Sequence, residues 1–141
     1  MGRTLSNDAL QYIAVFEDVT GAPATDCVID EEAGRLVFVV ATGEMGTAIG
    51  PGGRTVQRLE DRLDKDVDLV EDADTPEAFV ANALSPAAVY NVTISENETT
   101  IAYVEVAQED VGVAIGAEGR NIETARLLAE RHFDVDDVQL T

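Results

Sequence analysis

The fold of this chain follows from one short stretch, AIGPGGRTV at residues 48–56, which returns 66 residues later as AIGAEGRNI at residues 114–122. In both versions an apolar residue precedes a Gly-x-x-Gly turn and an arginine follows it. A branched aliphatic residue comes two positions after each arginine. One such turn would be a weak signal, but two in register predict that the chain is built from two copies of one unit.

The glycines of each turn suit a loop that binds an anion. Glycine adopts backbone angles that are closed to other residues, so it lets main-chain N–H groups come close to a ligand. A helix is expected to begin directly after each turn, where unpaired N–H groups and the helix dipole favour a negative charge. Arg54 and Arg120 stand where a bound phosphate would need a cation. Each turn therefore predicts a phosphate-binding site.

The two turns resemble the Gly-x-x-Gly loop of KH domains, which clamps a few nucleotides of single-stranded nucleic acid. Two tandem copies with no further domain resemble the archaeal NusA-like transcription factors, which are similar to the KH pair of bacterial NusA without its polymerase-binding and S1 domains. The resemblance covers nearly the whole chain. It implies an α+β fold with two tandem type II (prokaryotic) KH domains, residues 1–72 and 73–141, each with helices packed on one face of a three-stranded sheet.

Hydrophobic periodicity and turn residues predict one order of elements in both halves: helix, strand, strand, helix, loop, helix, strand. In the first half the predicted elements cover residues 6–19, 26–30, 35–41, 45–49, 53–63 and 67–71. In the second half they are a helix starting at Thr75-Pro76, strands at 89–95 and 100–107, a short helix to 115, a helix to about 131 and a strand at 135–140. This order matches the KH arrangement of prokaryotic proteins.

The composition favours two small aliphatic cores, because 45% of the 141 residues are hydrophobic and only 5% are aromatic. No apolar run reaches membrane-spanning length, and the first residues do not form a signal peptide, so we expect a cytoplasmic protein with no membrane partner. Cys27 is the single cysteine, which excludes an internal disulfide and a thiolate metal cluster. No cofactor, metal or small-molecule substrate is expected.

The net charge of −19 is the opposite of what a nucleic-acid-binding protein usually carries. However, seven of the nine Lys and Arg residues lie in residues 44–65 and 108–132, around the two turns. Disorder and a basic partner could each account for the acidity, but dispersed acids and a single lysine favour adaptation to high salt. At about 1 M salt the Debye length is roughly 3 Å, so distant carboxylates would hardly repel a phosphate.

The helix after the first turn should carry a basic stripe. At about 100° per residue, Arg54, Arg58, Arg62 and Lys65 fall on one side, and an apolar face is left for the core. A solvated helix with ordinary ion pairs is the alternative. Because the stripe begins at the turn in a chain with few bases, we interpret it as a phosphate-contacting surface.

The second helix is less regular, because Arg120 and Arg131 share a side while Arg126 points elsewhere. Ile122, Ala125 and Ala129 are expected to face the core. The middle of the second turn carries Glu118, where many KH loops have Lys or Arg, and the first turn is not basic there either. The first copy is therefore predicted to supply more of the electrostatic contact.

The bases of a bound strand would need an apolar floor, for which Ile49, Val56, Ile115 and Ile122 are the candidates, although a core role is favoured for all four. Phe38 and Tyr103 lie on predicted strands and are expected to pack rather than to stack on bases. His132 is expected to be half-buried near a helix end, and Cys27 to be a small core residue.

The sequence thus predicts a non-enzymatic, single-stranded RNA-binding protein that, by resemblance, acts on nascent transcripts in transcription elongation, pausing or termination, with RNA polymerase as an implied partner. No catalytic or metal site is expected, and neither turn has the Gly-Lys-Ser/Thr of a Walker loop. Two alternatives stay open: a ribosome- or RNA-processing-associated KH protein, and a KH-fold protein–protein adaptor with weakened RNA binding. The predicted RNA-binding residues are Ile49, Gly50, Pro51, Gly52, Gly53, Arg54, Arg58, Arg62, Ile115, Gly116, Ala117, Glu118, Gly119, Arg120 and Asn121.

Overall fold

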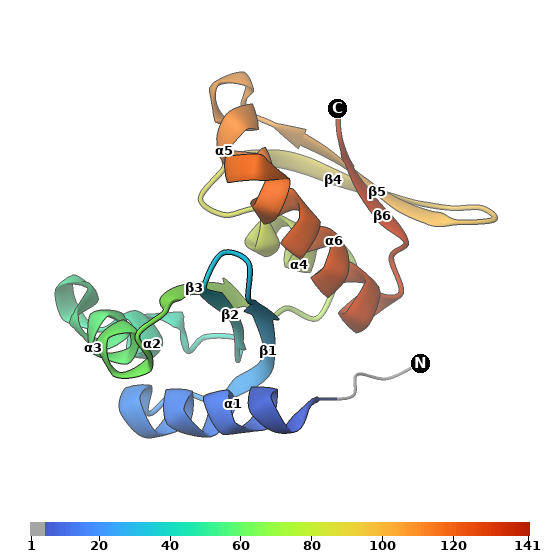
Figure 1. Ribbon diagram of the computed structural model, residues 1–141. Coiled ribbons are helices and arrows are strands. Elements are labelled where there is room, and N and C mark those ends of the chain that lie inside the picture. The colour runs from blue at the N-terminus through green and yellow to red at the C-terminus, as the bar shows by residue number, and fades with distance from the viewer. Residues whose placement is uncertain (1–4) are drawn as a thin grey trace. The chain divides into compact units, whose positions relative to one another are not determined.

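The computed structural model describes residues 5–141, which form two compact units, one ending at Asp72 and the other beginning at Ala73. Both units have the same order of elements (Figure 1). The first contains α1 (Asn7–Thr20), β1 (Ala24–Asp30), β2 (Arg35–Val40), α2 (Met45–Ile49), α3 (Arg54–Leu63) and β3 (Asp66–Glu71). The second contains α4 (Pro76–Ala83), β4 (Val89–Glu96), β5 (Thr100–Val106), α5 (Val111–Ile115), α6 (Arg120–Phe133) and β6 (Asp137–Leu140).

The first helix of each unit starts where the sequence places it. The Ser6 hydroxyl accepts a hydrogen bond from the Ala9 N–H at 3.1 Å, and the Thr75 hydroxyl accepts one from the Ala78 N–H at 3.2 Å. Such caps satisfy N–H groups that have no partner inside the helix. Gly21 ends α1 in the left-handed conformation, with φ of 74°.

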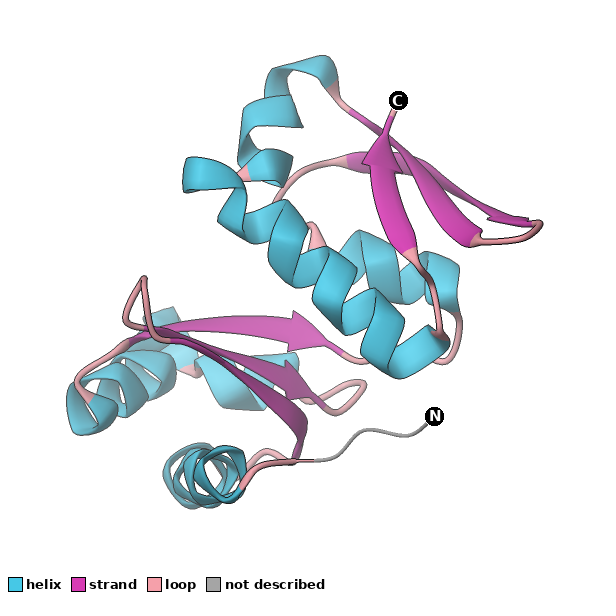
Figure 2. Ribbon diagram, turned by 45° about the vertical axis from the view of Figure 1, so that its right-hand side comes forward, coloured by secondary structure: helices cyan, strands magenta, loops and turns pink. Residues whose placement is uncertain are grey.

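Each unit has a three-stranded sheet with the same pairing. The first two strands form an antiparallel hairpin, and the third strand lies parallel to the second, in the orders β1-β2-β3 and β4-β5-β6. A parallel neighbour requires a crossover, which here consists of two helices separated by the glycine turn. Figure 2 shows the helices of each unit gathered on one face of its sheet. The predicted α+β architecture is confirmed.

The core of the first unit lies between its sheet and helices α1 and α3. The Phe16 and Phe38 rings stack with centroids 4.6 Å apart, and Leu59 of α3 is fully buried beside them. Burial of a leucine side chain contributes roughly 1.5–3 kcal/mol, so this contact holds the helix after the turn in place. Cys27 is buried in the same cluster, which confirms its expected role.

The core of the second unit lies between its sheet and helices α4 and α6. Ile122, Ala125 and Ala129 are buried as predicted, and Leu128 is buried with them. His132 is half-buried and stacks on Phe79, with ring centroids 4.9 Å apart, which confirms the structural role expected for it. Among residues 5–141, no helix has both the length and the apolar character needed to cross a membrane.

Candidate nucleic-acid interface

Steric contact requires the first residue of each turn to be glycine. Gly50 has φ of 75° and Gly116 has φ of 79°, both in the region that favours glycine. A Cβ atom at Gly50 would collide with the side chain of Thr55, and one at Gly116 would lie 2.7 Å from Cβ of Asn121. The chain therefore folds back on the start of the following helix too tightly for any side chain at this position.

The last glycine of each turn is different, because its surroundings are open. Gly53 and Gly119 have φ of 76° and 73°, and a Cβ at either would meet no atom of the described chain within 4 Å. Between the glycines, Gly52 and Glu118 share the left-handed region, with φ of 62° and 55°. The two turns thus follow one backbone path although their middle residues differ.

The start of the following helix is suited to binding an anion. Gly53 and Gly119 are the N-caps of α3 and α6, and no side chain among the described residues caps either helix. Their own N–H groups are used inside the turn, donating to the carbonyls of Gly50 and Gly116 at 3.0 and 3.1 Å. The N–H groups of Arg54 and Arg120 likewise donate to the carbonyls of Pro51 and Ala117. The N–H groups that follow them in the first turn of the helix are therefore the candidates for meeting an anion, assisted by the helix dipole.

Two arginines lie beside the first turn with their charge uncompensated. Arg54 and Arg58 are exposed, and neither forms an ion pair within residues 5–141. Both line an open hollow of about 440 Å³, together with Gly52, Gly53, Gln57 and Asp61. Glycine backbone and two guanidinium groups therefore border the same space.

The basic stripe continues along α3 to Arg62. Arg58 and Arg62 line a second hollow of about 300 Å³, together with Asp18 and Val19 of α1. Arg62 Nη1 lies 3.0 Å from Asp18 Oδ2, and both side chains are exposed. Because exposed ion pairs contribute little free energy, a phosphate could replace this carboxylate as the partner of Arg62.

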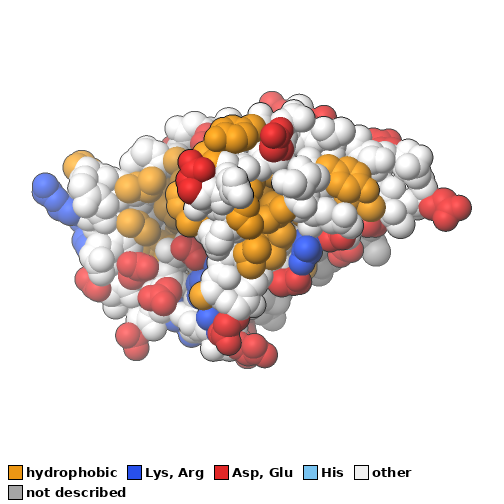
Figure 3. Space-filling model, turned by 90° about the horizontal axis from the view of Figure 1, so that it is seen from above, with side chains coloured by type: hydrophobic (Ala, Val, Ile, Leu, Met, Phe, Trp, Pro, Cys, Tyr) orange, Lys and Arg blue, Asp and Glu red, His pale blue; other side chains and the backbone are white. Residues whose placement is uncertain are grey.

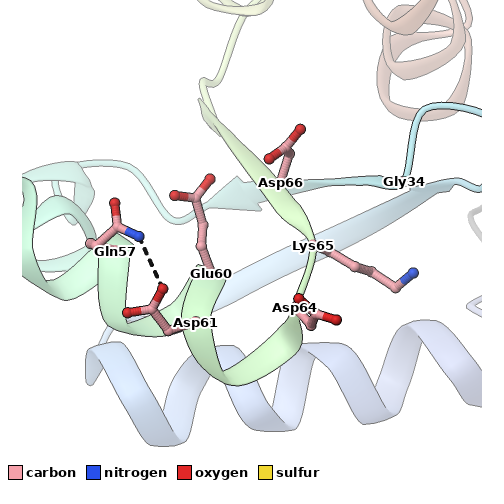
Figure 4. A pocket seen from close by; sticks show the side chains of 7 residues that line it. All are labelled: Gly34, Gln57, Glu60, Asp61, Asp64, Lys65 and Asp66. Atoms are coloured by element: carbon pink, nitrogen blue, oxygen red, sulfur yellow. Dashed lines mark hydrogen bonds between the residues drawn. The ribbon is translucent and has the colours of Figure 1, made fainter.

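Lys65 does not belong to the stripe, so the predicted helix face is wrong at this residue. Helix α3 ends at Leu63, and Asp64 takes the left-handed conformation with φ of 54°, so the 100° spacing no longer applies. Figure 4 shows the Lys65 side chain leaving the segment after the helix and pointing away from Gln57. It lines an acidic hollow with Gly34, Gln57, Glu60, Asp61, Asp64 and Asp66.

Acidic side chains are common here, but they do not form a metal site. No group of three or more His, Cys, Asp or Glu side chains in the part of the chain that the structure describes is arranged to hold a metal ion.

The second turn has less free positive charge. Arg120 Nη2 donates to Glu118 Oε2 at 2.6 Å, so the middle residue of the turn neutralises the arginine that follows it. Arg126 lies away from the turn, because its guanidinium pairs with Glu123 and Asp137 and donates to the carbonyl of Val138 on β6. The sequence could show Glu118 and Arg120 two residues apart, but not that they pair.

The carboxyl group of Asp137 has a lowered pKa. The causes are a hydrogen bond from the Gln139 side chain, a backbone hydrogen bond from Val138 and the charge of Arg126, which together outweigh partial burial. This group fastens the edge strand β6 to α6, away from the turn.

Ile49 and Ile115, the residues before the two turns, are exposed, at 38% and 39%. The expectation that they belong to the core is therefore wrong, whereas it holds for Ile122, which is buried. In each short helix the preceding alanine, Ala48 or Ala114, is fully buried, so the next residue, about 100° further round, points outward.

The sequence also missed exposed hydrophobic side chains in the second unit. Val113 on α5 is 44% exposed and Leu127 on α6 is 41% exposed. Phe38 is in the core as predicted, but Tyr103 is 36% exposed and does not pack as expected. In Figure 3 hydrophobic side chains, in orange, reach the surface among acidic ones, and basic ones are few.

Comparison with known proteins gives matches over both units. The family model of the KH domain matches residues 11–75, and that of the NusA-like second KH domain matches residues 76–140. The probable transcription termination protein NusA of Halococcus morrhuae is 64% identical over 97% of both chains. The chain belongs to the family of NusA-like KH proteins. Its resemblance to that family, inferred from the two turns, is confirmed.

Two further matches extend the comparison. The probable transcription termination protein NusA of Halobacterium salinarum is 66% identical, again over 97% of both chains. The crystal structure of APE1850 is 36% identical, covers 97% of this chain and all of its own, and has a TM-score of 0.83. These matches support the tandem KH fold independently of the turn geometry.

Proposed function

We propose that this protein binds single-stranded RNA through its two glycine turns and acts in transcription elongation, pausing or termination, as the names of its relatives imply. The observation that carries the proposal is the first turn. There, an uncapped helix start and two arginines without ion pairs border one open hollow, and an exposed isoleucine directly precedes the turn. That combination suits a phosphate and the base attached to it.

In this mechanism the strand is held by its backbone first. A phosphate would accept hydrogen bonds from N–H groups at the start of α3, while Arg54 and Arg58 supply charge-assisted hydrogen bonds. The strand would continue along α3 toward Arg62, with a base lying over Ile49. Stacking would contribute little, because no aromatic side chain among the described residues lies in the first turn or its hollow.

The second turn would hold the strand more weakly. The proposed contacts are Ile115, the backbone of Gly116 to Gly119, Arg120 and Asn121. Asn121 Nδ2 donates to the carbonyls of Val113 and Ala114 at 3.3 Å each, so it braces the turn against α5. With the two units connected directly at residues 72 and 73, binding at one turn would raise the effective concentration of RNA at the other.

The wider role follows from this binding. We propose that the RNA is the nascent transcript, that RNA polymerase is a partner, and that the protein is not an enzyme and works in the cytoplasm. The domain boundary at residues 72 and 73 belongs to the same proposal, with one RNA contact in each domain. Adaptation to high salt would let the direct arginine contacts persist while the long-range repulsion from the acidic surface is screened.

A second candidate, a protein–protein adaptor with weakened RNA binding, is favoured by one observation. Glu118 pairs with Arg120 within the second turn, so this arginine is less available to RNA than Arg54 is. A ribosome- or RNA-processing-associated role would use the same RNA contacts and differs only in where the RNA comes from. Cross-linking of bound RNA to peptides that contain residues 50–54 separates RNA binding from a purely adaptor role.

The direct test is RNA affinity after both middle residues of the first turn are made acidic, Pro51→Asp with Gly52→Asp. The left-handed conformation at residue 52 tolerates aspartate better than most residues, and Glu118 occupies it in the second copy. The matched control is Asn97→Asp with Thr99→Asp, which adds the same charge at the β4–β5 turn. We expect at least about a tenfold loss of affinity for the first variant and little for the control. Equal losses would mean that only net charge matters.

A further inference from the structure

The sheet of the second unit has an open face that the RNA-binding proposal does not use. Along β5, Ala102, Val104 and Val106 are buried against the helices, while Tyr103 and Glu105 alternate with them and are exposed. Successive residues of a strand point to opposite faces, so these two lie on the side away from the helices. Figure 2 shows that the helices of this unit cover the other side of the sheet.

The strand register adds neighbours to this surface. Thr93 and Gln139 lie opposite Tyr103, and Asn91 lies opposite Glu105. The register shifts between Val89 and Asn91, and the residue between them, Tyr90, is 67% exposed. A bulge of this kind re-aims a side chain on the bulged strand. We define the outer face by five exposed residues, Asn91, Thr93, Tyr103, Glu105 and Gln139, together with the exposed Tyr90 at the bulge next to Asn91.

The corresponding positions of the first unit differ in both chemistry and exposure. The positions that correspond to the exposed Thr93, Tyr103 and Glu105 are occupied there by Val28, Val37 and Val39, which are buried. Valine is a common strand residue, and it satisfies the same pairing in β1 and β2. The second copy thus replaces three valines with side chains that can form hydrogen bonds, ion pairs and ring contacts.

The charge of this surface favours a cation over a nucleic-acid strand. Strands β4, β5 and β6 contain no Lys or Arg, and the outer face carries the exposed carboxylate of Glu105. The three arginines of residues 73–141 all lie on α6, on the helical side of the sheet. The one that reaches the sheet edge, Arg126, is already paired with Glu123 and Asp137.

We propose that the outer face is a docking surface for an arginine-rich segment of a partner protein. A guanidinium group stacks on a tyrosine ring through cation–π attraction and can pair with Glu105 through two parallel hydrogen bonds. Asn91, Thr93 and Gln139 supply further polar groups around the rings. Arginine is preferred to lysine, because its flat guanidinium group can stack and pair at the same time.

The test uses the full chain and two probes of equal charge, a synthetic peptide of arginines and one of lysines, at several salt concentrations. We expect the arginine peptide to bind more tightly, and the combination of Tyr90→Ala and Tyr103→Ala to weaken it by about fivefold or more. Glu105→Gln should also weaken it. In the tyrosine variant, binding of the lysine peptide and of single-stranded RNA should change by less than about twofold.

Controls and contrary outcomes are available within the same unit. Leu127→Ala removes a hydrophobic side chain from the helical side that is about as exposed as Tyr103, and Glu77→Gln removes an exposed acid from α4. Both should leave binding of the arginine peptide unchanged. The proposal is overturned if the tyrosine variant loses both peptides equally, which indicates general charge attraction. It is overturned as well if that variant loses RNA instead, which would make the tyrosines a base-stacking surface.

Discussion

The two glycine turns have the same backbone path but different chemistry. Gly50 and Gly116 are held in matching conformations by contact with the helix that follows, so the shape is set by the first glycine in both copies. The middle residue sets the charge instead. Gly52 leaves Arg54 without an ion pair among the described residues, whereas Glu118 holds Arg120.

The difference continues along the neighbouring helices. The place of Arg58 in the first copy is taken by Thr124 in the second, whose hydroxyl donates to the carbonyl of Arg120 at 2.8 Å. The place of Asp61 is taken by the exposed Leu127. The comparison shows that one fold supplies the same turn twice, and that a few surface positions set the charge around it.

The largest expected effect tests whether the first copy carries most of the electrostatic contact. Reversing Arg54 and Arg58 to Glu would remove the two charge-assisted hydrogen bonds proposed for them and should weaken RNA binding by roughly a hundredfold. Reversing Arg120 and Arg131 should weaken it by about tenfold or less, because Arg120 is already neutralised. Titrations of labelled RNA at one fixed salt concentration give the ranking, and the opposite ranking would refute it.

The next largest effect is expected at the first glycine of each turn, Gly50 or Gly116, which has the same conformation in both copies. Gly50→Ala and Gly116→Ala each introduce a collision with the start of the following helix, so each should lower the free energy of unfolding by about 2 kcal/mol or more. Gly53→Ala meets no clash and should cost only about 1 kcal/mol of backbone strain. Urea unfolding followed by circular dichroism measures all three. Equal losses for the first and last glycines would contradict the steric account.

A smaller effect is expected when the middle residues of the two turns, Gly52 and Glu118, are exchanged. Glu118→Gly should release Arg120 and raise RNA affinity by about twofold to fivefold, and Gly52→Glu should lower it by a similar factor. The exchanged double variant should bind RNA about as well as the original chain, with the stronger contact moved to the second turn. Cross-linking yields at the two turns would show the move, and unchanged yields would count against it.

The smallest effect concerns the contact between the helix after each glycine turn and the strand that follows it, α3 with β3 and α6 with β6. In the first unit Glu60 accepts a hydrogen bond from the Val67 N–H at 2.9 Å, and in the second Arg126, at the corresponding position, donates to the Val138 carbonyl. The lowered pKa of Asp137, which pairs with Arg126, means that its stabilising contribution is complete above the ordinary value of 3.8. That contribution is lost as the pH falls through the lower value of the folded state.

Asp137→Asn should therefore lower the stability at neutral pH and remove part of the loss of stability below about pH 3.8. Urea midpoints of the original chain and the variant, measured across this range, give the difference. Parallel curves for the two proteins would show that the carboxylate does not contribute.

Much of the fold could be predicted from local signals. The caps at Ser6 and Thr75, the hairpin turns and the paired glycine turns each depend on residues close in sequence, and all are where the sequence places them. Lys65 was misplaced because a helix face was extended past the residue where the helix ends. The exposure of Ile49 and Ile115 was missed because an apolar residue beside a core alanine looks like core in a linear pattern.

The sequence by itself determined that this chain consists of two KH units with a glycine turn and an arginine in each, since repeat spacing and turn chemistry are local properties. Only the tertiary structure decided which arginines carry free charge, which apolar residues reach solvent, and that Tyr103 and Glu105 share an open sheet face. Those outcomes depend on contacts between residues distant in sequence or on the direction of side chains at a surface, and no local pattern contains either.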